Sequence, residues 1–299
     1  MDGFINLYKD SGWTSHDCVA KLRRLLQTKK VGHGGTLDPS ARGVLPIAVG
    51  RATRLLQYLP TDKAYRAVVR FGLTTNTDDL AGEVLSQTPA DHLDRAAVEA
   101  QLPSFQGTIE QVPPLYSAIH VDGQRLYRLA RKGSIDIEIP SRSVTIYSIQ
   151  ATDWTPGHQP ELTLDITCGP GTYIRSIARD LGQHLGVGAT LRSLLRTKSC
   201  GFTLERSVSL TDIATESNQS CAIAPATAMA HLPKVVLSEE AARRWRCGQK
   251  LINPADFPES QVVRVASNAC DFLGIGQPMN DRGVTYLVPK MVFQPPSFI

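Results

Sequence analysis

One carboxylate stands out as a candidate for chemistry, because it lies in a segment rich in glycine and poor in charge. The segment VGHGGTLDPSARGVLPIAVG, residues 31–50, contains Asp38, and its only other ionisable side chains are His33 and Arg42. Asp-Pro-Ser is also a typical start of a helix, with Asp at the N-cap and Pro at the first helical position. The spacing alone favours this structural role over catalysis.

Two features of the flanking sequence favour chemistry at Asp38. Gly34 and Gly35 precede it, and residues without a side chain let another molecule approach the backbone closely. The segment KLRRLLQTKK, residues 21–30, carries five cations and no acid, which is typical of a protein that binds a polyanion. Phosphates would repel a carboxylate in such a site, so we expect one that is kept there to take part in the chemistry.

Four other side chains could assist Asp38, and each has an ordinary structural alternative. His33 could act as a general base, but we favour a histidine that stacks on a ligand or forms a hydrogen bond with it. Arg175 lies off the apolar stripe of an expected helix, where an arginine usually faces water and could instead pair with a carboxylate. Tyr65 and Tyr173 begin a strand-like and a helix-like segment, where tyrosine most often packs.

Motifs for metal, nucleotide and serine-hydrolase chemistry are absent from the sequence. It contains no H-E-x-x-H, no zinc-deaminase signature, no Walker loop, no G-x-G-x-x-G after a strand and no G-x-S-x-G. Its six cysteines form no C-x-x-C pair and do not lie near a histidine at zinc-ligand spacing, so we expect reduced thiols. The sequence therefore predicts an activity that uses no metal and no cofactor.

Basic residues gather in separate segments, although the net charge of the chain is only +4. Besides residues 21–30, three acid-free basic segments are GQRLYRLARKG (123–133), LRSLLRTK (191–198) and ARRWRCGQK (242–250). Acids gather elsewhere, as in residues 76–83. Solvated helix faces would explain any one basic segment, but four together favour a polyanionic partner. Tyr127 and Trp245 lie within them and could either stack on RNA or pack in a core.

The elements that must position these side chains include both helices and strands, which is compatible with an α+β protein. Thr14 and Asp17 predict a capping box at the start of a helix with an apolar face. Strands are expected at residues 64–73, 143–154 and 161–168, because these segments are rich in β-branched residues or alternate in polarity. Further helices are expected within residues 91–105, ending before Pro103, and after the Gly-Pro-Gly turn within residues 169–188.

The last part of the chain differs in amino-acid composition from the rest. Residues 214–233 are small and include prolines, which predicts a domain boundary there. Residues 238–249 then predict a short helix, and strand-like segments at 262–267, 272–278 and 284–289 predict a small β-rich module. We therefore expect a catalytic domain over residues 1–232 and a module over residues 233–299. No signal peptide or membrane-spanning run is visible, so a cytoplasmic protein is expected.

Several long motifs resemble those of the TruB family of tRNA pseudouridine synthases, and they occur in the family's order over roughly residues 3–215. They are GWTSHDCV, HGGTLDPSARGVLPIAVGRATR, KAYRAVVRFG, QVPPLYSAIHVDGQRLYRLARKG and CGPGTYIRSIARDLG. One departure is Asp10, which follows Lys9 where the family usually has proline. The tail from about residue 235 loosely resembles the small, PUA-like RNA-binding module of bacterial members.

The resemblance implies a fold and a reaction. The fold would be α+β, with a mixed, largely antiparallel sheet flanked by helices, a central cleft, and a small β-rich C-terminal RNA-binding module. The reaction would convert uridine 55 in the T-arm of tRNA to pseudouridine. In the roles that it implies, Asp38 is the nucleophile, Tyr65 stacks on the flipped base and handles the proton at C5, and Arg175 pairs with the aspartate.

The resemblance also implies residues that bind the substrate, which are His33, Gly34, Gly35, Tyr173 and Leu191. Leu191 would line the pocket and Tyr173 would support it, while His33 would enter the T-loop and help to replace the flipped nucleotide. The two glycines would let the RNA come close to the backbone. No metal site is implied.

Two other functions remain open. An RNA-binding or tRNA-folding protein without catalysis would need the basic segments but not the combination of Asp38, Tyr65 and Arg175. A member that acts on another RNA could be directed by a guide RNA. Residues 74–106 and 120–140 resemble insertions that contact the T-arm in bacterial members, and this favours a stand-alone enzyme. The expected partner is therefore the T-arm of tRNA, with no guide RNA and no membrane, and the expected state is a monomer.

Overall fold

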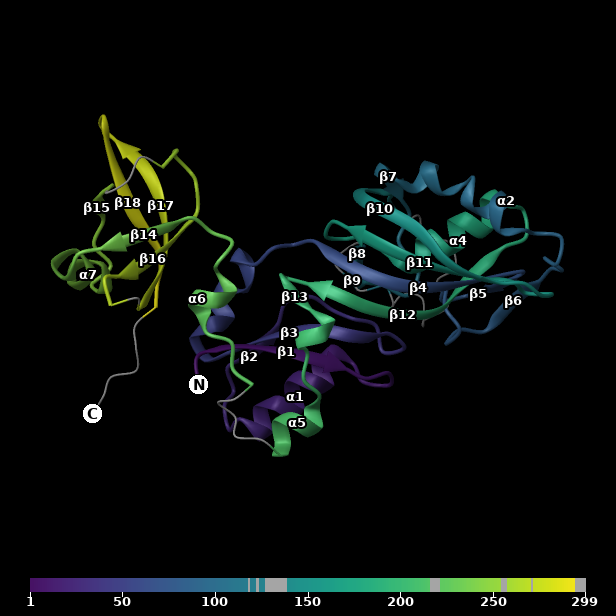
Figure 1. Ribbon diagram of the computed structural model, residues 1–299, viewed down its shortest axis with the longest axis horizontal. Helices are drawn as coiled ribbons and strands as arrows, with labels where there is room; N and C mark the ends of the chain where they lie inside the picture. Colours follow the sequence, from purple (N-terminus) through teal and green to yellow (C-terminus); the bar gives the residue numbers. More distant parts are fainter. Residues whose placement is uncertain are drawn as a thin grey trace.

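The computed structural model describes residues 1–117, 119–121, 124–126, 139–215, 221–253, 257–269 and 271–293. Most of this described part forms a nine-stranded sheet with helices around it (Figure 1). The order across the sheet is β1 (Gly3–Lys9), β3 (Arg42–Val49), β12 (Ala189–Ser199), β4 (Lys63–Phe71), β11 (Glu161–Cys168), β10 (Arg142–Thr155) and β7 (Gly107–Gln111). Two short strands extend it, β2 (Val31–His33) beside β3 and β13 (Phe202–Thr203) beside β12.

The strand directions confirm the expected fold class. Within the described sheet β12 runs parallel to β3, and the other neighbouring strands are antiparallel. The smaller elements of the same body are η1 (Gly50–Tyr58), β5 (Leu73–Thr75), β6 (Val84–Gln87), α2 (Arg95–Glu99), η2 (Leu102–Phe105), β8 (His120–Val121), β9 (Gln124–Arg125) and η3 (Leu204–Arg206). A mixed, largely antiparallel sheet with flanking helices is an α+β architecture.

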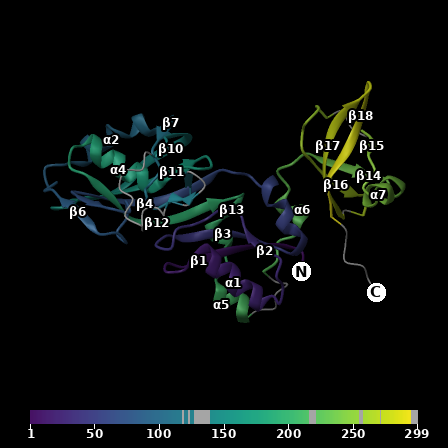
Figure 2. The same cartoon turned by 180° about the vertical axis from the view of Figure 1, so that it is seen from behind.

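Helices bury one face each against this sheet. α4 (Ile174–His184) contacts β12 and β4 and shares a core with Leu162, Leu164 and Ile166 of β11. α1 (Ser15–Leu25) and α5 (Leu210–Thr215) lie side by side below β1 and β3 in Figure 1, and Figure 2 shows the same pair from behind. α4 therefore covers the central strands of the sheet, while α1 and α5 cover the strands at its N-terminal end.

Several local predictions are confirmed. Thr14 accepts a hydrogen bond from the Asp17 amide while the Asp17 carboxylate accepts one from the Thr14 amide, so the capping box starts α1. The alternating segment at 161–168 forms β11. The helix expected within residues 91–105 is α2, which ends before Pro103 as predicted but covers only Arg95–Glu99; Pro103 lies in the separate turn η2, near whose start a proline is tolerated.

The C-terminal strands form a sheet of their own. In the described residues its order is β14 (Lys234–Leu237), β16 (Val263–Ser267), β17 (Phe272–Asp281), β18 (Val284–Val292) and β15 (Leu251–Ile252), with α7 (Glu239–Arg246) against it. Trp245 of α7 is fully buried in this part, so it packs rather than stacking on RNA. Ile275 and Met291 belong to a core that also contains Phe4 and Val44, so the two parts share apolar packing.

Hydrogen bonds also join the C-terminal sheet to the segment before it. Arg264 of β16 donates from Nε to the Leu232 carbonyl at 3.1 Å and from Nη1 to the Ala226 carbonyl at 3.3 Å. Ala226 belongs to the short helix α6 (Pro225–Ala228). Over the part of the chain that the structure describes, no helix is both long and apolar enough to cross a membrane.

Candidate active site

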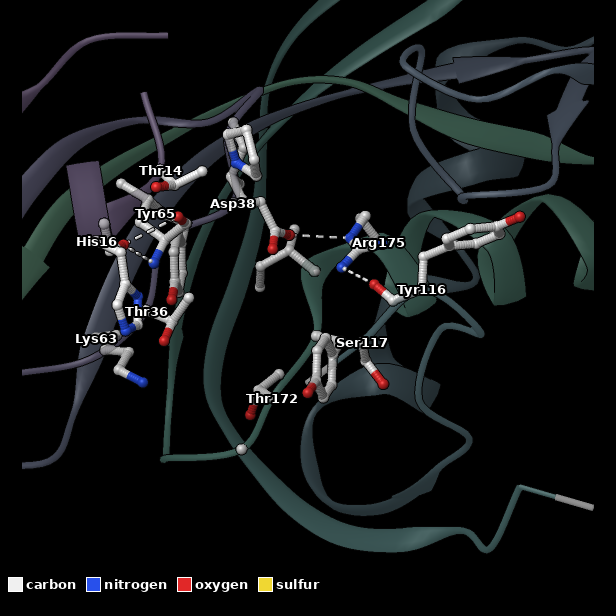
Figure 3. A pocket seen from close by; sticks show the side chains of 17 residues that line it. Thr14, His16, Thr36, Asp38, Lys63, Tyr65, Tyr116, Ser117, Thr172 and Arg175 are labelled. Atoms are coloured by element: carbon white, nitrogen blue, oxygen red, sulfur yellow. Dashed lines mark hydrogen bonds and ion pairs between the residues drawn. The ribbon is translucent and has the colours of Figure 1, made fainter. Parts of the chain in front are cut away.

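A cavity of about 510 Å³ lies where the start of α1, the loop after β2, the start of β4 and the start of α4 meet (Figure 3). Asp38, Tyr65, Tyr173 and Arg175 all line it. These residues are far apart in the sequence, and the antiparallel pairing of β4 with β11 and β12 brings their elements to one place. The cavity therefore gathers four of the side chains singled out from the sequence.

Asp38 and Arg175 form an ion pair at the centre of the cavity (Figure 3). Arg175 Nε lies 3.0 Å from Asp38 Oδ2, and the Arg175 side chain is 6% exposed while that of Asp38 is 38% exposed. The Nε–H makes no directed hydrogen bond, so charge joins the two groups. Arg175 Nη1 donates to the Thr77 carbonyl at 2.9 Å and Nη2 to the Tyr116 carbonyl at 3.1 Å. The guanidinium is thus fixed by the backbone while it faces the accessible carboxylate.

The loop around Asp38 differs from the helix start that its sequence favoured. Asp38 caps no helix, because Pro39 and Ser40 form a single turn that the hydrogen bond from the Ala41 amide to the Asp38 carbonyl closes at 3.1 Å. β3 begins directly afterwards at Arg42. The helix-cap alternative is therefore wrong, and the carboxylate is left to face the cavity.

Neighbouring segments occupy the backbone groups that flank Asp38. The Ser15 hydroxyl accepts from the Leu37 amide at 2.9 Å and lies 3.1 Å from the Leu37 carbonyl, to which it donates. The Gly12 amide donates to the Pro39 carbonyl at 2.8 Å. Lys9, which is fully buried, donates to the carbonyls of Asp10, Trp13 and Pro39. These bonds fix the loop on both sides of the carboxylate.

The two glycines before Asp38 serve the protein's own packing. A side chain at Gly34 would meet Cys200 Sγ at 3.0 Å and Pro46 Cβ at 3.3 Å, so protein atoms already fill that space. Gly35 has a φ of +141°, a conformation that favours glycine. Packing within the protein therefore accounts for glycine at position 34, and the exposed residues of this loop are Thr36, Pro39 and Ser40.

Tyr65 lies in β4 and is almost fully buried, with 6% of its surface exposed. Burial raises its pKa to about 12, and the nearby Arg196 guanidinium opposes part of that rise. Arg196 stands opposite Tyr65 in the neighbouring strand β12. The phenol is consequently neutral at ordinary pH, and the Tyr65 side chain is one of those that line the cavity.

Tyr173 is the residue that precedes α4, and its backbone is held on both sides by one side chain. The Gln111 amide group accepts from the Tyr173 N–H at 2.7 Å and donates to the Tyr173 carbonyl at 3.1 Å. Burial raises the pKa of the Tyr173 phenol. The side chain lines the cavity close to Ser117, a residue that the sequence did not single out.

Leu194, and not Leu191, is the residue of β12 that lines the cavity. Leu194 pairs with Ala67 in β4, whereas Leu191 pairs with Val69, farther from Tyr65 along the strand. A bulge between Leu191 and Ser193 makes the facing of β12 difficult to count from the sequence. Leu191 instead lines a separate space of about 40 Å³ next to Asp38 and Arg175. The assignment of Leu191 as the residue that lines the main cavity is therefore corrected to Leu194.

His33 lies beside the cavity, in β2, and does not line it. Its ring meets the ring of His16 edge to face, with 5.6 Å between centroids, and His16 lines the cavity. His33 Nδ1 accepts from the Gly35 amide at 3.3 Å, which fits a neutral ring. Burial, together with His16 and Arg196, lowers the pKa of His33.

The acidic segment 76–83 lies against the site, which was not predicted from the sequence. Asp78 Oδ2 pairs with Arg179 Nη1 at 3.1 Å, and burial raises the pKa of Asp78. Asp79 accepts from the Ser40 hydroxyl at 3.1 Å, next to the loop of Asp38. These acids therefore connect α4 and the Asp38 loop through the Thr77 segment, whose carbonyl also holds Arg175.

The four basic segments differ in how exposed their cations are and in whether those cations are paired. In 191–198, Arg196 is fully buried and donates to the carbonyls of Gly35, Thr36 and Val44, while Lys198 pairs with Asp62, so this segment is no free basic surface. Cations of 21–30 and of α7 are largely exposed. Most of 123–133, including Tyr127, lies outside the described residues.

A metal site was not expected from the sequence. Among the residues that the structure describes, no group of three or more His, Cys, Asp or Glu side chains is placed to hold a metal ion.

Comparison with known proteins assigns the family. Residues 23–174 match the TruB family pseudouridylate synthase N-terminal domain, residues 175–242 the tRNA pseudouridylate synthase B C-terminal domain, and residues 233–293 the C-terminal domain of pseudouridine synthase II TruB. The tRNA pseudouridine synthase B of Gloeothece citriformis (strain PCC 7424) is 54% identical over 98% of this chain and 97% of its own. That of Synechocystis sp. (strain PCC 6803 / Kazusa) is 52% identical over 98% and 99%.

Two solved structures share the fold. A chain of a Cbf5-Nop10-Gar1 complex superposes with a TM-score of 0.74 at 28% identity and covers 98% of this chain and 85% of its own. A chain of an H/ACA RNP bound to a substrate RNA containing 2'-deoxyuridine gives 0.73 at 26% identity, with the same coverage. The family domains and the full-length relatives together show that this protein belongs to the TruB family of pseudouridylate synthases.

Proposed function

We propose that the protein converts uridine to pseudouridine at position 55 in the T-arm of tRNA, with Asp38 as the nucleophile. The observation that carries the proposal is the accessible Asp38 carboxylate, paired with a fixed Arg175 in a cavity that Tyr65 also lines. Full-length relatives named tRNA pseudouridine synthase B support tRNA as the substrate. The reaction exchanges a glycosidic C–N bond for a C–C bond, which requires a nucleophile and proton transfer.

The target uridine must leave its stack to reach the carboxylate. Flipping a nucleotide costs a few kcal/mol, and stacking on an aromatic side chain returns roughly 1–3 kcal/mol per base. Tyr65 and Leu194 offer the apolar surfaces on which a flat base could rest. We assign Asp38 to attack on the nucleotide and Arg175 to hold the carboxylate and offset its charge.

Tyr65 acts first as the stacking surface in this proposal. Its pKa of about 12 keeps the phenol protonated at neutral pH, so it is a weak base before substrate binds. Removal of the C5 proton by Tyr65 would require a developing phenolate. The Arg196 guanidinium, which lowers the pKa of Tyr65, would stabilise that charge.

We also propose that residues 1–232 form the catalytic domain and residues 233–299 an RNA-binding domain. The separate sheet that begins at Lys234 supports this division. The exposed cations of residues 21–30 and of α7 would contact phosphates. His33 would lie at the edge of the cavity, behind His16, where the rest of the T-loop would be.

A guided function is the second candidate, because the H/ACA RNP chain resembles this fold. The two hypotheses differ in whether the protein needs a second RNA. The high identity over full length to proteins named tRNA pseudouridine synthase B favours the stand-alone enzyme.

The test is pseudouridine mapping on tRNA transcribed in vitro and treated with the purified protein and no other RNA. We expect one modified position, uridine 55, and tritium release from [5-³H]uridine tRNA. Asp38→Asn should abolish the reaction and keep tRNA affinity within about tenfold, because the amide has the shape of the carboxylate. Activity of the variant above a few per cent would contradict the nucleophile, and a requirement for added RNA would favour the guided function.

A further inference from the structure

The cavity contains a cation that the protein itself leaves without a partner. Lys63 is the first residue of β4 and lines the cavity two positions before Tyr65, so both side chains leave the same face of the strand. Among the described residues none forms a hydrogen bond or an ion pair with the Lys63 ammonium. Figure 3 shows Lys63 on the side of the cavity away from Arg175.

The other cations near the Asp38 loop are already committed. Arg175 donates to two carbonyls and faces Asp38. Arg196 and Lys9 are fully buried and donate to three carbonyls each. Within the described part of the site, Lys63 is therefore the cation with free donors and access to the cavity.

The position of Lys63 is unfavourable for an unpaired charge. Its side chain is half-buried, and burial and the nearby Arg196 lower the pKa of its ammonium. The end of the side chain lies against Gly35, since a Cβ built there would be 3.6 Å from Lys63 Cε and 3.7 Å from Nζ. A cation kept in such a place costs free energy until an anion joins it. An anionic group of the substrate would offset that cost.

We infer that Lys63 binds a phosphodiester group next to the flipped uridine. The inference rests on the function proposed above. A flipped nucleotide carries a phosphate on each side into a site that already holds the negative charge of Asp38. The uracil ring is neutral, so a compact ammonium gains most by pairing with a phosphate. Lys63 would thus bind and orient the nucleotide, while Tyr65 on the same strand face contacts the base.

The affinity test uses Lys63→Met and Lys63→Arg with a T-arm stem-loop RNA. For binding, the RNAs carry 2'-deoxy nucleotides at the target and the preceding position, and one phosphate beside the target is left normal or replaced by an uncharged methylphosphonate. We expect Lys63→Met to weaken binding of the normal RNA about tenfold and to reduce the slope of log affinity against log salt by about one. Lys63→Arg should keep most of the affinity, because it keeps the charge.

The two changes should not add. The methylphosphonate at the contacted side should weaken binding by the wild type about tenfold and by Lys63→Met very little, because the same contact is already lost. At saturating all-ribose RNA, the single-turnover rate of Lys63→Met should fall by a smaller factor than its affinity for the RNA. Lys198→Met is the matched control. Lys198 lies in the neighbouring strand β12, opposite Ala64 at the same end of the sheet, but it pairs with Asp62 and does not line the cavity.

Each alternative result is distinguishable. If the methylphosphonate weakens wild type and Lys63→Met equally at both positions, Lys63 contacts no phosphate and the inference is wrong. A loss of saturating rate with unchanged affinity would place Lys63 on the reacting base and would also overturn it. If the wild type forms no pseudouridine in the unmodified stem-loop or in tRNA, the proposed function fails instead.

Discussion

The guanidinium of Arg175 depends on its planar shape, because three groups surround it at once. Two backbone carbonyls and the Asp38 carboxylate face its nitrogens. The ammonium of a lysine is a single point and cannot occupy these positions together. We expect Arg175→Lys and Arg175→Ala to reduce single-turnover rate by at least a hundredfold, with less than a tenfold change in tRNA affinity.

Filter binding and single-turnover kinetics on the same tRNA would separate the two effects. Arg175→Ala also leaves the carbonyls of Thr77 and Tyr116 without their donors, so its unfolding should be followed by urea titration. A variant that loses affinity and keeps its saturating rate would identify Arg175 as a phosphate contact, and the ion-pair role would be wrong.

Tyr65 gives a pH dependence of stability with a definite sign. Its pKa in the folded protein is about 12, above the value of about 10 for an exposed tyrosine. Below pH 10 Tyr65 keeps its proton in both the folded and the unfolded state, so its contribution to the free energy of unfolding is fully present. Above pH 10 the unfolded chain ionises first, so stability falls until the folded state also ionises near pH 12. The full difference corresponds to about 3 kcal/mol, an order-of-magnitude value.

Urea unfolding of wild type and Tyr65→Phe at pH 9 and pH 11 would measure this. Between these two pH values the wild type should lose about 1.4 kcal/mol more than the variant, because Phe has no proton to release. Other groups that titrate in this range are common to both proteins and cancel. Equal losses would show that Tyr65 titrates alike in the folded and unfolded states.

At the scale of elements, the start of α1 acts as a clamp on the loop of Asp38. Ser15 is buried and exchanges two hydrogen bonds with Leu37, the residue before the carboxylate. Ser15→Ala would leave the amide and carbonyl of Leu37 unsatisfied, at a cost of about 1–3 kcal/mol in the free energy of unfolding. Because a displacement of about 1 Å can cost about a hundredfold in rate, we expect a 10- to 100-fold lower single-turnover rate.

Ser11→Ala is the matched control for this clamp. Ser11 also donates to the loop, at the Ser40 carbonyl, but its hydroxyl is exposed and water can replace it. Its rate and its stability should stay within about twofold and about 0.5 kcal/mol of wild type. If the two serine variants behave alike in urea unfolding and in turnover, the clamp does not position Asp38.

Elements with a local signal were predictable from the sequence. The capping box of Thr14 and Asp17 and the alternation in β11 depend on neighbours within a few residues, and both are found as expected. Asp38 illustrates the limit. Its Asp-Pro-Ser pattern favoured a helix, but hydrogen bonds with Gly12 and Ser15, distant in the sequence, hold the segment as a loop.

The remaining misses have the same physical origin, because they depend on contacts that the sequence does not list. Arg196 resembles a surface cation until β12 is placed beside β4, where the buried guanidinium donates to the carbonyls of Gly35, Thr36 and Val44. The choice of Leu194 over Leu191 depends on a bulge in β12. The family resemblance supplied the roles of Arg175 and Tyr65. Their spacing alone favoured packing for Tyr65 and a solvated face for Arg175, with a carboxylate partner as the alternative for the arginine.

At the scale of the whole molecule, the C-terminal sheet is tied to the catalytic body. Ile275 and Met291 share a core with Phe4, and Arg264 is hydrogen-bonded to the segment before β14. Deleting the module would therefore expose apolar surface as well as remove the RNA contacts proposed for it. Its contribution to binding is better measured by changing exposed charges in the full-length chain.

Arg243 and Arg244 are suited to that measurement, because both are exposed on α7. The next residue, Trp245, is buried and anchors α7 in the core of the C-terminal sheet. If α7 contacts phosphates, the double variant Arg243→Gln with Arg244→Gln should weaken tRNA binding roughly tenfold at moderate salt. The slope of log affinity against log salt should become shallower by up to about two, since each phosphate contact contributes about 0.9. The saturating rate should not change, because the cavity lies in the other sheet.

Arg66→Gln provides the control for charge alone. Arg66 alternates with Tyr65 along β4, so it leaves the opposite face of the strand, where it pairs with Asp165. Removing this exposed cation changes net charge without touching α7 or the cavity, and its salt slope should equal that of wild type. If the salt slopes of Arg66→Gln and of the α7 double variant both fall in proportion to the charge removed, only the overall electrostatic field of the protein attracts tRNA. An unchanged slope in the α7 double variant would mean that tRNA does not reach α7.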